Sequence, residues 1–196
     1  MKRLGIYFFF DKDGIVDKYV DYVLEDLTKH VDKLIVVCNG QLNERGRKTF
    51  EKFTGNIIVR ENKGFDVWAY KTAIDSEGWN KLIEYDEIIL MNYTIMGPVY
   101  PLKEMFDIMD KRLELDFWGI TKCFQENSPV AQQIWQCPYG YIPEHIQSSF
   151  MAFRRSIVSS TIFQKYWDEM PMIKSYYESG GSHEPVSYTH LRAHET

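Results

Sequence analysis

The short motifs that mark the common cofactor and hydrolase sites are absent from this sequence. The turn after its first apolar run reads Asp11-Lys12-Asp13-Gly14 and contains no G-x-G-x-x-G, which argues against a dinucleotide cofactor. The absence of G-x-x-x-x-G-K-[ST] argues against P-loop phosphoryl transfer, and the absence of G-x-S-x-G argues against an α/β-hydrolase. The sequence also lacks H-E-x-x-H and a cysteine cluster, so nothing in it indicates a zinc site.

Cysteine, positive charge and long apolar runs are also scarce. The three cysteines, Cys38, Cys123 and Cys137, are an odd number without metal-like spacing and do not indicate an oxidising compartment. The net charge of −5 argues against a nucleic-acid partner, which needs a basic face. The N-terminal apolar run stops at Phe10, too early for a signal peptide or a membrane span. We therefore expect a cytoplasmic protein and leave open a peripheral association with the inner face of the membrane.

The sequence does contain a regular alternation of short apolar runs with helical stripes. A chain of 196 residues, 44% of them hydrophobic, can bury the core of one domain. The apolar runs are short and rich in β-branched residues, as in strands buried on both faces of a parallel sheet. Their order predicts an α/β fold with a Rossmann-like, mostly parallel sheet flanked by helices. Strands are expected over residues 4–10, 34–38, 56–59, 87–91, 117–121 and 147–153.

The segments between these runs have helical patterns, with one exception. Helices are expected over residues 16–31, 43–53, 67–76, 101–112 and 159–170, and Asn43 is the expected N-cap of the second. Residues 125–143 contain Pro129, Pro138 and Gly140, so an irregular loop is expected there. A loop of this length inside a domain is usually functional or mobile.

Polar turns containing glycine, or leading to it, follow the third and fourth expected strands. The first is Asn62-Lys63-Gly64-Phe65-Asp66, and the second begins with Asn92-Tyr93-Thr94. In open α/β sheets ligands bind outside the carboxyl ends of the strands, so these turns indicate a candidate site. Asp66 stands where its carboxylate would cap the following helix, and a cap and a ligand contact can coexist.

Five segments of the chain resemble the rhamnan synthesis F family, whose members look like GT-A-type glycosyltransferases and include rhamnosyltransferases of bacterial cell-wall polysaccharides. They are residues 5–27 (GIYFFFDKDGIVDKYVDYVLEDL), 61–74 (ENKGFDVWAYKTAI), 89–102 (ILMNYTIMGPVYPL), 117–121 (FWGIT) and 145–156 (HIQSSFMAFRRS). The resemblance implies a transferase that moves a deoxysugar, rhamnose from dTDP-rhamnose, to a cell-surface polysaccharide or a lipid-linked glycan. Two rivals stay open: a transferase with another nucleotide-sugar donor, and a non-catalytic domain that binds a nucleotide or a glycan.

The resemblance also implies roles for residues on the nucleotide side of the site. Asn39, in the turn after the second strand, would touch the donor base. Asn62, Gly64 and Asp66 would line the nucleotide, and Gly64 would let the backbone approach it closely.

The end of the fourth strand departs from the pattern of the family. GT-A enzymes commonly carry acids there that hold a divalent cation and the donor diphosphate, whereas this sequence has Asn92-Tyr93-Thr94. Mg²⁺ and Mn²⁺ prefer carboxylate oxygens to amide and hydroxyl oxygens. Asn92 and Thr94 are the candidate contacts to the diphosphate. Either they act without a metal, helped by backbone N–H groups and a Lys or Arg, or a carboxylate such as Asp66 or Asp116 substitutes.

Direct displacement at an anomeric carbon needs a base that takes the proton of the acceptor hydroxyl. The resemblance implies an Asp or Glu late in the chain, and the candidates are Asp116, Glu144 and Glu184. We expect Asp116 and Glu184 to be the catalytic carboxylates. Glu184 stands where relatives carry a late acidic residue.

The last eleven residues, 186–196 (VSYTHLRAHET), resemble the translation of a sequencing adapter. We therefore expect residues 1–185 to be a single glycosyltransferase-like domain that is incomplete at its C-terminal end, and residues 186–196 to be an artefactual tail. His190 and His194 then have no meaning as metal ligands, despite their i, i+4 spacing.

Overall fold

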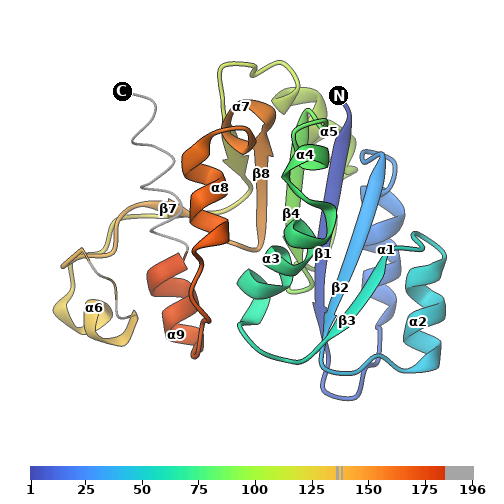
Figure 1. The fold of residues 1–196 in the computed structure, drawn as a ribbon, viewed down its shortest axis with the longest axis horizontal. Coiled ribbons are helices and arrows are strands. Elements are labelled where there is room, and N and C mark those ends of the chain that lie inside the picture. The colour runs from blue at the N-terminus through green and yellow to red at the C-terminus, as the bar shows by residue number, and fades with distance from the viewer. Residues whose placement is uncertain (136, 138, 184–196) are drawn as a thin grey trace.

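A computed structural model of the chain describes residues 1–135, 137 and 139–183. Within them the main sheet has six strands in the order β3-β2-β1-β4-β8-β5, with helices on both faces (Figure 1). β3, β2, β1 and β4 are parallel to one another, whereas β8 is antiparallel to both of its neighbours, β4 and β5. The mostly parallel α/β sheet predicted from the sequence is confirmed.

Strands and helices alternate up to β4, except that two helices, α3 and α4, separate β3 from β4. The elements after β4 are shorter and less regular. The strands are β1 (Arg3–Phe10), β2 (Lys33–Asn39), β3 (Ile57–Arg60), β4 (Glu87–Asn92), β5 (Phe117–Gly119), β6 (Lys122–Cys123), β7 (His145–Ile146) and β8 (Phe150–Arg154). The helices are α1 (Lys18–Leu27), α2 (Glu44–Glu51), α3 (Phe65–Glu77), α4 (Trp79–Leu82), α5 (Leu102–Met109), α6 (Pro129–Trp135), α7 (Arg155–Val158), α8 (Thr161–Asp168), α9 (Tyr176–Glu178) and the π-helical turn η1 (Ser179–His183). None of these helices, in the part of the chain described, is long and apolar enough to cross a membrane.

The core lies on both faces of the sheet, because side chains of the central strands alternate between two apolar clusters. On β1, Ile6 and Phe8 pack in the cluster that includes α3 and α8, whereas Tyr7 and Phe9 pack in the cluster that includes α1, α2 and α5. Strands buried on both faces have no polar side, which explains why they form nearly continuous apolar runs in the sequence.

The prediction of an irregular segment over residues 125–143 was wrong for residues 129–135. The segment contains α6, and a β-bridge pairs Glu126 with Ile142 near its two ends. None of the seven residues of α6 is buried, so the helix has no apolar stripe by which a sequence pattern could indicate it.

Of the two predicted N-caps, one is confirmed and one was wrong. Asn43 caps α2, and its side chain accepts the N–H of Gly46 at 2.7 Å. Asp66 does not cap α3 but lies within its first turn, and the N-cap is Gly64. Gly64 has a φ of 75°, a left-handed conformation that glycine adopts without the steric cost of a Cβ.

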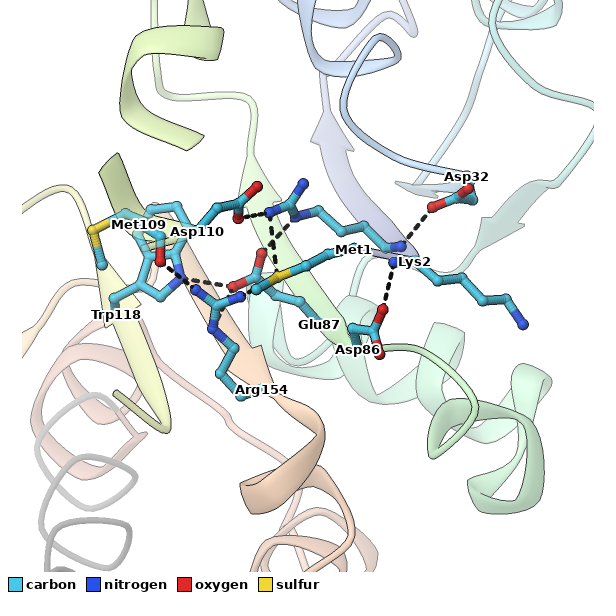
Figure 2. Close-up of polar contacts among 10 residues, drawn as sticks. Met1, Lys2, Asp32, Asp86, Glu87, Met109, Asp110, Trp118 and Arg154 are labelled. Atoms are coloured by element: carbon cyan, nitrogen blue, oxygen red, sulfur yellow. Dashed lines mark hydrogen bonds and ion pairs between the residues drawn. The ribbon is translucent and has the colours of Figure 1, made fainter. Parts of the chain in front are cut away.

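A buried ion network joins β1, β4, β5 and β8 at the edge of the sheet where β1 and β4 begin (Figure 2). Glu87, the first residue of β4, is fully buried and accepts hydrogen bonds from Arg3 Nε and Trp118 Nε1, both at 2.7 Å. Arg154 Nε lies 3.2 Å from the same carboxylate, and Asp110 forms an ion pair with Arg3. Two guanidinium groups and two carboxylates therefore balance in charge.

The carboxylate of Asp26, on α1, caps α5 from across the molecule. Its Oδ2 accepts the N–H of Leu102, the first residue of α5, at 2.7 Å, and its Oδ1 accepts from Lys29 Nζ at 3.2 Å. Desolvation raises the pKa of Asp26, but the Leu102 N–H and the Lys29 ammonium outweigh it, so that the pKa is lowered overall.

Asp26→Ala is expected to lower the free energy of unfolding by about 1 kcal/mol at neutral pH, the typical cost of removing an N-cap. Because the pKa of Asp26 is lowered in the folded protein, its contribution is complete above the ordinary pKa of an aspartate, about 4. The contribution is lost as the pH falls through the folded-state pKa. Urea denaturation between pH 7 and pH 3 should show the difference between variant and wild type narrowing with acid. A difference that stays constant would contradict the assignment.

The hydroxyl of Tyr7 is buried and has no hydrogen-bond partner among the residues that the structure describes. Its burial raises the pKa of Tyr7. Tyr7→Phe is expected to raise the free energy of unfolding by about 1 kcal/mol, because it removes a polar group that lost its hydration on folding without compensation. Urea denaturation measures this, with Tyr22→Phe on exposed α1 surface as the control. A loss of stability in Tyr7→Phe alone would contradict the prediction.

Candidate functional site

The direction of winding reverses between β1 and β4. The strand order runs outward from β1 through β2 to β3, and β4 then pairs with the other side of β1. In doubly wound sheets, ligands bind at such a switch point outside the carboxyl ends of the strands. A cavity of about 780 Å³ lies there, lined by the ends of β1 and β4, the start of α3 and the residues before β8.

The cavity wall combines aromatic rings with hydroxyl, amide and carboxyl groups. The rings are those of Phe8, Phe10, Phe65, Tyr93, Phe124, Trp135 and Tyr176. The polar side chains are those of Asn62, Asp66, Asn92, Thr94, Glu126, His145, Gln147, Ser148, Ser149 and Ser179. The described part of the wall contains neither lysine nor arginine.

Asp66 is the centre of a hydrogen-bond network on this wall, and only 8% of the residue is exposed. Its Oδ2 accepts from Ser148 Oγ at 2.9 Å and from Asn92 Nδ2 at 3.3 Å. Its Oδ1 accepts from the N–H of Val67 at 3.0 Å and from Ser179 Oγ at 3.4 Å. One carboxylate thereby connects the start of α3, the end of β4, the turn before β8 and η1.

The phenol of Tyr93 lies next to this network. Burial first, and then the negative charge of Asp66, raise the pKa of Tyr93. The Tyr93 ring packs edge-on against Phe8 and Phe9, and its carbonyl accepts the hydroxyl of Tyr19 at 2.8 Å. These contacts hold the end of β4 against β1 and α1.

Two residues at the end of β4, Asn92 and Thr94, are hydrogen-bonded to each other on the cavity wall. Asn92 Oδ1 accepts both the N–H (3.1 Å) and the hydroxyl of Thr94. Mg²⁺ and Mn²⁺ are held chiefly by carboxylate oxygens, and the nearest carboxylate, Asp66, already accepts four hydrogen bonds. Across residues 1–135, 137 and 139–183, no group of three or more His, Cys, Asp or Glu side chains is placed to hold a metal. This set of groups does not fit a divalent cation.

Two residues behind the cavity hold the turn between β3 and α3. Arg60 Nη1 donates to Asn39 Oδ1 at 2.6 Å and to the carbonyl of Lys63 at 2.8 Å. Asn39 Nδ2 donates to the carbonyl of Phe65 at 3.1 Å. The side-chain amide of Asn39 therefore bridges Arg60 to Phe65, the first residue of α3. This bridge positions the start of α3 and with it the side chain of Asp66.

The backbone of this turn is left-handed at two successive residues, Gly64 and Phe65, with φ values of 75° and 55°. A Cβ on Gly64 would lie 2.4 Å from the side chain of Trp68, so only glycine fits. For Phe65 the left-handed conformation costs about 1–3 kcal/mol, a strain that persists only where surrounding contacts compensate for it. The hydrogen bond from Asn39 to the carbonyl of Phe65 is such a contact.

Helices α6 and α9 and the turn η1 lie beside the sheet (Figure 1), and their residues line one side of the cavity. The ring of Trp135, at the end of α6, packs against Tyr176 and Tyr177, with ring centroids 5.7 Å from each. Gly180 and Gly181 let η1 approach α6: a Cβ on Gly181 would lie 1.5 Å from the carbonyl oxygen of Trp135.

Four of the residues singled out in the sequence come together on the cavity wall: Asn62, Asp66, Asn92 and Thr94. Two others, Asn39 and Gly64, do not line the cavity but shape the turn that positions Asp66. A contact between Asn39 and a donor base stays a prediction.

The two expected catalytic acids are not on the described wall. Asp116 precedes β5 and lies level with Glu87, at the edge of the sheet opposite the cavity, because Arg154 pairs with Glu87 and donates its N–H to the Asp116 carbonyl. The Asp116 carboxylate accepts the hydroxyl of Ser156. Glu184 lies outside the described residues, as does the tail 186–196 with its two histidines.

Sequence reasoning did not assign His145, Ser148 or Ser179 to the site. His145 is buried, with Nδ1 2.8 Å from the carbonyl of Pro143, and Ser148 belongs to the same HIQSSF stretch. That stretch was one of the five segments that carry the resemblance, so its polar residues were a usable signal. Ser179 is in a segment without a pattern of that kind, 113 residues from Asp66 in the sequence.

Comparisons with known proteins assign the chain to a family. The model of the family described as rhamnan synthesis protein F matches residues 34–194. An uncharacterized protein, y4gN of Sinorhizobium fredii, is 23% identical over 150 residues, which are 76% of this chain and 35% of the relative; the chain thus spans about a third of that relative.

Two solved structures are similar to this chain at low sequence identity. A CMP:2-keto-3-deoxy-manno-octonic acid synthetase complexed with CTP has a TM-score of 0.52 at 14% identity, covering 100% of this chain and 87% of the other. A glucosyl-3-phosphoglycerate synthase from Mycobacterium tuberculosis, in complex with UDP, has a TM-score of 0.46 at 12% identity, covering 80% and 57%. The first confirms the predicted fold class, and the family match over most of the sequence shows that this chain belongs to the rhamnan synthesis protein F family.

Proposed function

We propose that this chain is a glycosyltransferase domain that moves a sugar, rhamnose from dTDP-rhamnose, to a cell-surface polysaccharide or a lipid-linked glycan. The observation that carries the proposal is the cavity at the switch point of the sheet, with Asn62, Asp66 and Asn92 on one wall. Membership of the rhamnan synthesis protein F family supports rhamnose as the sugar. A polysaccharide or lipid-linked acceptor would place the protein in the cytoplasm, at the inner face of the membrane.

The donor nucleotide would lie over the carboxyl ends of β1 to β3, with Asn62 at the boundary between the nucleotide and the cavity. Two basic residues lie near Asn62 in the sequence: Arg60 ends β3, and Lys63 follows Asn62 in the turn. Lys63 Nζ is exposed and lies 2.8 Å from Glu61, an ion pair weak enough in water to exchange for a diphosphate. This proposal uses no metal, because the residues at the end of β4 do not fit one.

In the proposed reaction, an oxygen of the acceptor hydroxyl forms a bond to the anomeric carbon. The bond from that carbon to the diphosphate oxygen breaks, and the nucleoside diphosphate leaves with the electron pair. The proton of the hydroxyl goes to a base. Asp66 is poorly suited to that role, because its oxygens already accept four hydrogen bonds. Glu184 remains the proposed base, whereas Asp116 lies at the opposite edge of the sheet and has no part.

The proposal is tested by incubating the purified chain with dTDP-rhamnose, and separately with UDP-glucose, and measuring the release of nucleoside diphosphate. Release from dTDP-rhamnose that increases on addition of a rhamnose-containing glycan is expected. Faster release from UDP-glucose would contradict rhamnose as the sugar but leave a transferase in place. Asp75→Asn changes a carboxylate of α3 that is about half exposed and does not line the cavity, so it should leave the rate unchanged.

One observation favours a second candidate, a non-catalytic domain that binds a nucleotide or a glycan. The groups at the end of β4 are hydrogen-bonded to one another or to Asp66 and do not fit a cation. A cation at this position would usually assist the departure of the diphosphate. Tight binding of dTDP together with no release from any nucleotide sugar would favour this candidate over the transferase.

A further inference from the structure

The described wall of the cavity contains one side chain that can carry a positive charge, that of His145. This wall has no lysine or arginine, and the groups at the end of β4 do not fit a divalent cation. Lys63 does not line the cavity, and its side chain is 59% exposed, so its ion pairs are weakened by water. His145 is only 4% exposed, and a charge acts more strongly on a ligand where water is excluded.

The two ring nitrogens of His145 have different roles. Nδ1 lies 2.8 Å from the backbone carbonyl of Pro143. A carbonyl oxygen can only accept a hydrogen bond, so Nδ1 carries a proton in this contact. The ring therefore gains or loses its second proton at Nε2, and a contact between the ring edge and a ligand goes through that atom. With Nε2 protonated, the imidazolium is both a cation and a hydrogen-bond donor.

The stretch that contains His145 lies next to the end of β4. The backbone N–H of Asn92 donates to the carbonyl of Ser149 at 3.0 Å. The side chains of Asn92 and Ser148 share one acceptor, Asp66 Oδ2. His145 itself is held by the pairing of β7 with β6. It is therefore fixed on the same wall as Asn92, where the sequence predicts contacts to the diphosphate.

We propose that His145, as the imidazolium, contacts the diphosphate of the donor and stabilises its negative charge as it leaves. When the bond from the anomeric carbon to the diphosphate oxygen breaks, that oxygen takes the electron pair, and Nε2–H donates a hydrogen bond to the diphosphate. His145 keeps its proton, so the proton of the acceptor hydroxyl still goes to a separate base. This role rests on the proposed function, and it supplies the positive charge that a metal would otherwise provide.

The charges around His145 favour its protonated form. The other titratable side chains on the described wall are those of Asp66, Tyr93, Cys123, Glu126 and Tyr176. The two carboxylates are negative at neutral pH and attract a cation, whereas the phenols and the thiol are largely uncharged there. The adjacent Glu144 is paired with Lys122 at 2.8 Å. A bound diphosphate adds negative charge, so its binding should draw a proton onto His145.

His145→Asn tests the contact while sparing the support of the wall, because the Asn amide can still donate to the Pro143 carbonyl. Binding of dTDP and of UDP is measured by calorimetry between pH 6 and pH 9. At pH 6 the wild type should bind the nucleotide about tenfold more tightly than His145→Asn, the lower value for a hydrogen bond to a charged group. At pH 9 the difference should be less than about twofold, because imidazole loses its proton above about pH 6.5.

Proton uptake on binding is a readout that a merely structural role would not move. At pH 7, in two buffers of different ionisation enthalpy, the wild type should take up about half a proton more than His145→Asn. The terminal phosphate of the nucleotide titrates near about pH 6, but its contribution is common to both proteins and cancels. His30→Asn is the matched control, because the His30 ring packs against Phe106 and does not line the cavity. It should bind like the wild type.

Turnover separates stabilisation of the leaving group from simple binding. His145→Asn should lower kcat with dTDP-rhamnose by about 100-fold, the effect of removing one donor to a developing charge. His145→Gln keeps a neutral donor near Nε2 but loses the contact with Pro143, and circular dichroism checks that both variants are folded. Low kcat in His145→Gln together with wild-type kcat and proton uptake in His145→Asn would overturn the proposal in favour of a structural role.

The wild type alone provides a further test, because the diphosphate of dTDP-rhamnose does not titrate near neutral pH. Its Kd should rise several-fold from pH 6 to pH 9, and a constant Kd would overturn the proposal. Turnover with wild-type kcat in folded His145→Asn would overturn it too and leave the transferase standing. Proton uptake that depends on His145, without turnover of dTDP-rhamnose or UDP-glucose, would leave the contact standing and overturn the transferase. Binding of neither dTDP nor UDP would overturn both.

Discussion

Asp66→Asn is expected to lower kcat/KM for sugar transfer by about 100-fold. Each carboxylate oxygen accepts one hydrogen bond from a serine hydroxyl and one from an N–H group, so whichever oxygen becomes an NH₂ group faces an N–H donor. A hydrogen bond to a charged group contributes about 1.5–3 kcal/mol, and the upper value corresponds to about 100-fold in rate if the site is distorted accordingly. The distortion displaces Asn92, Ser148 and Ser179 together, because Asp66 is the group that they share.

Steady-state kinetics with dTDP-rhamnose measure this effect, and Asp75→Asn is the matched control on the same helix. Asp75 is about half exposed and does not line the cavity, so its substitution should leave kcat/KM for sugar transfer unchanged. Circular dichroism of Asp66→Asn checks that the chain is folded before its rate is interpreted. Wild-type kcat/KM in folded Asp66→Asn would remove Asp66 from the site and separate the network from function.

Glu87→Ala is expected to lower the free energy of unfolding by about 3–5 kcal/mol, the cost of removing one partner from a buried ion pair. The variant leaves Arg3 and Arg154, whose side chains are 6% and 9% exposed, with one carboxylate fewer between them, and it leaves Trp118 Nε1 without its acceptor (Figure 2). Domains of this size are typically stable by about 5–15 kcal/mol, so the variant should be only marginally folded. Urea denaturation at 25 °C measures the difference.

Two further variants make the Glu87 result interpretable. Glu87→Gln keeps the acceptor oxygen and the shape while removing the charge, so a loss smaller than in Glu87→Ala separates charge from packing. Glu84→Ala removes the exposed partner of Lys2, an ion pair of 3.5 Å whose expected contribution is at most about 1 kcal/mol. A cost below about 1 kcal/mol in Glu87→Ala as well would show that the buried network contributes little.

The substitutions at Asp66 and at Glu87 act at opposite ends of the strands of the same sheet. Glu87 is the first residue of β4 and Asn92, which donates to Asp66, is the last. Glu87→Gln, if folded, should therefore bind and turn over a nucleotide sugar like the wild type. Asp66→Asn should bind and turn over the nucleotide sugar poorly, although it should retain most of its free energy of unfolding.

The sequence by itself determined the central strands and one half of the site. Strands buried on both faces need apolar side chains at every position, and that local requirement is visible in the apolar runs of β1, β2 and β4. The turn that contains Asn62 and Asp66 and the residues Asn92 and Thr94 follow directly after strands. Parallel strands bring their carboxyl ends to one edge, so the grouping of these four residues on the cavity wall required no further information.

Only the tertiary structure decided the other half of the site. Ser148 and Ser179 reach Asp66 across 82 and 113 residues of sequence, and nothing in their local pattern specifies that partner. The edge on which Asp116 lies depends on the direction of β5, which is fixed by antiparallel pairing with β8 rather than by its own residues. Local sequence specifies which residues are buried and where the chain turns, but the pairing of distant segments is set by the packing of the whole chain.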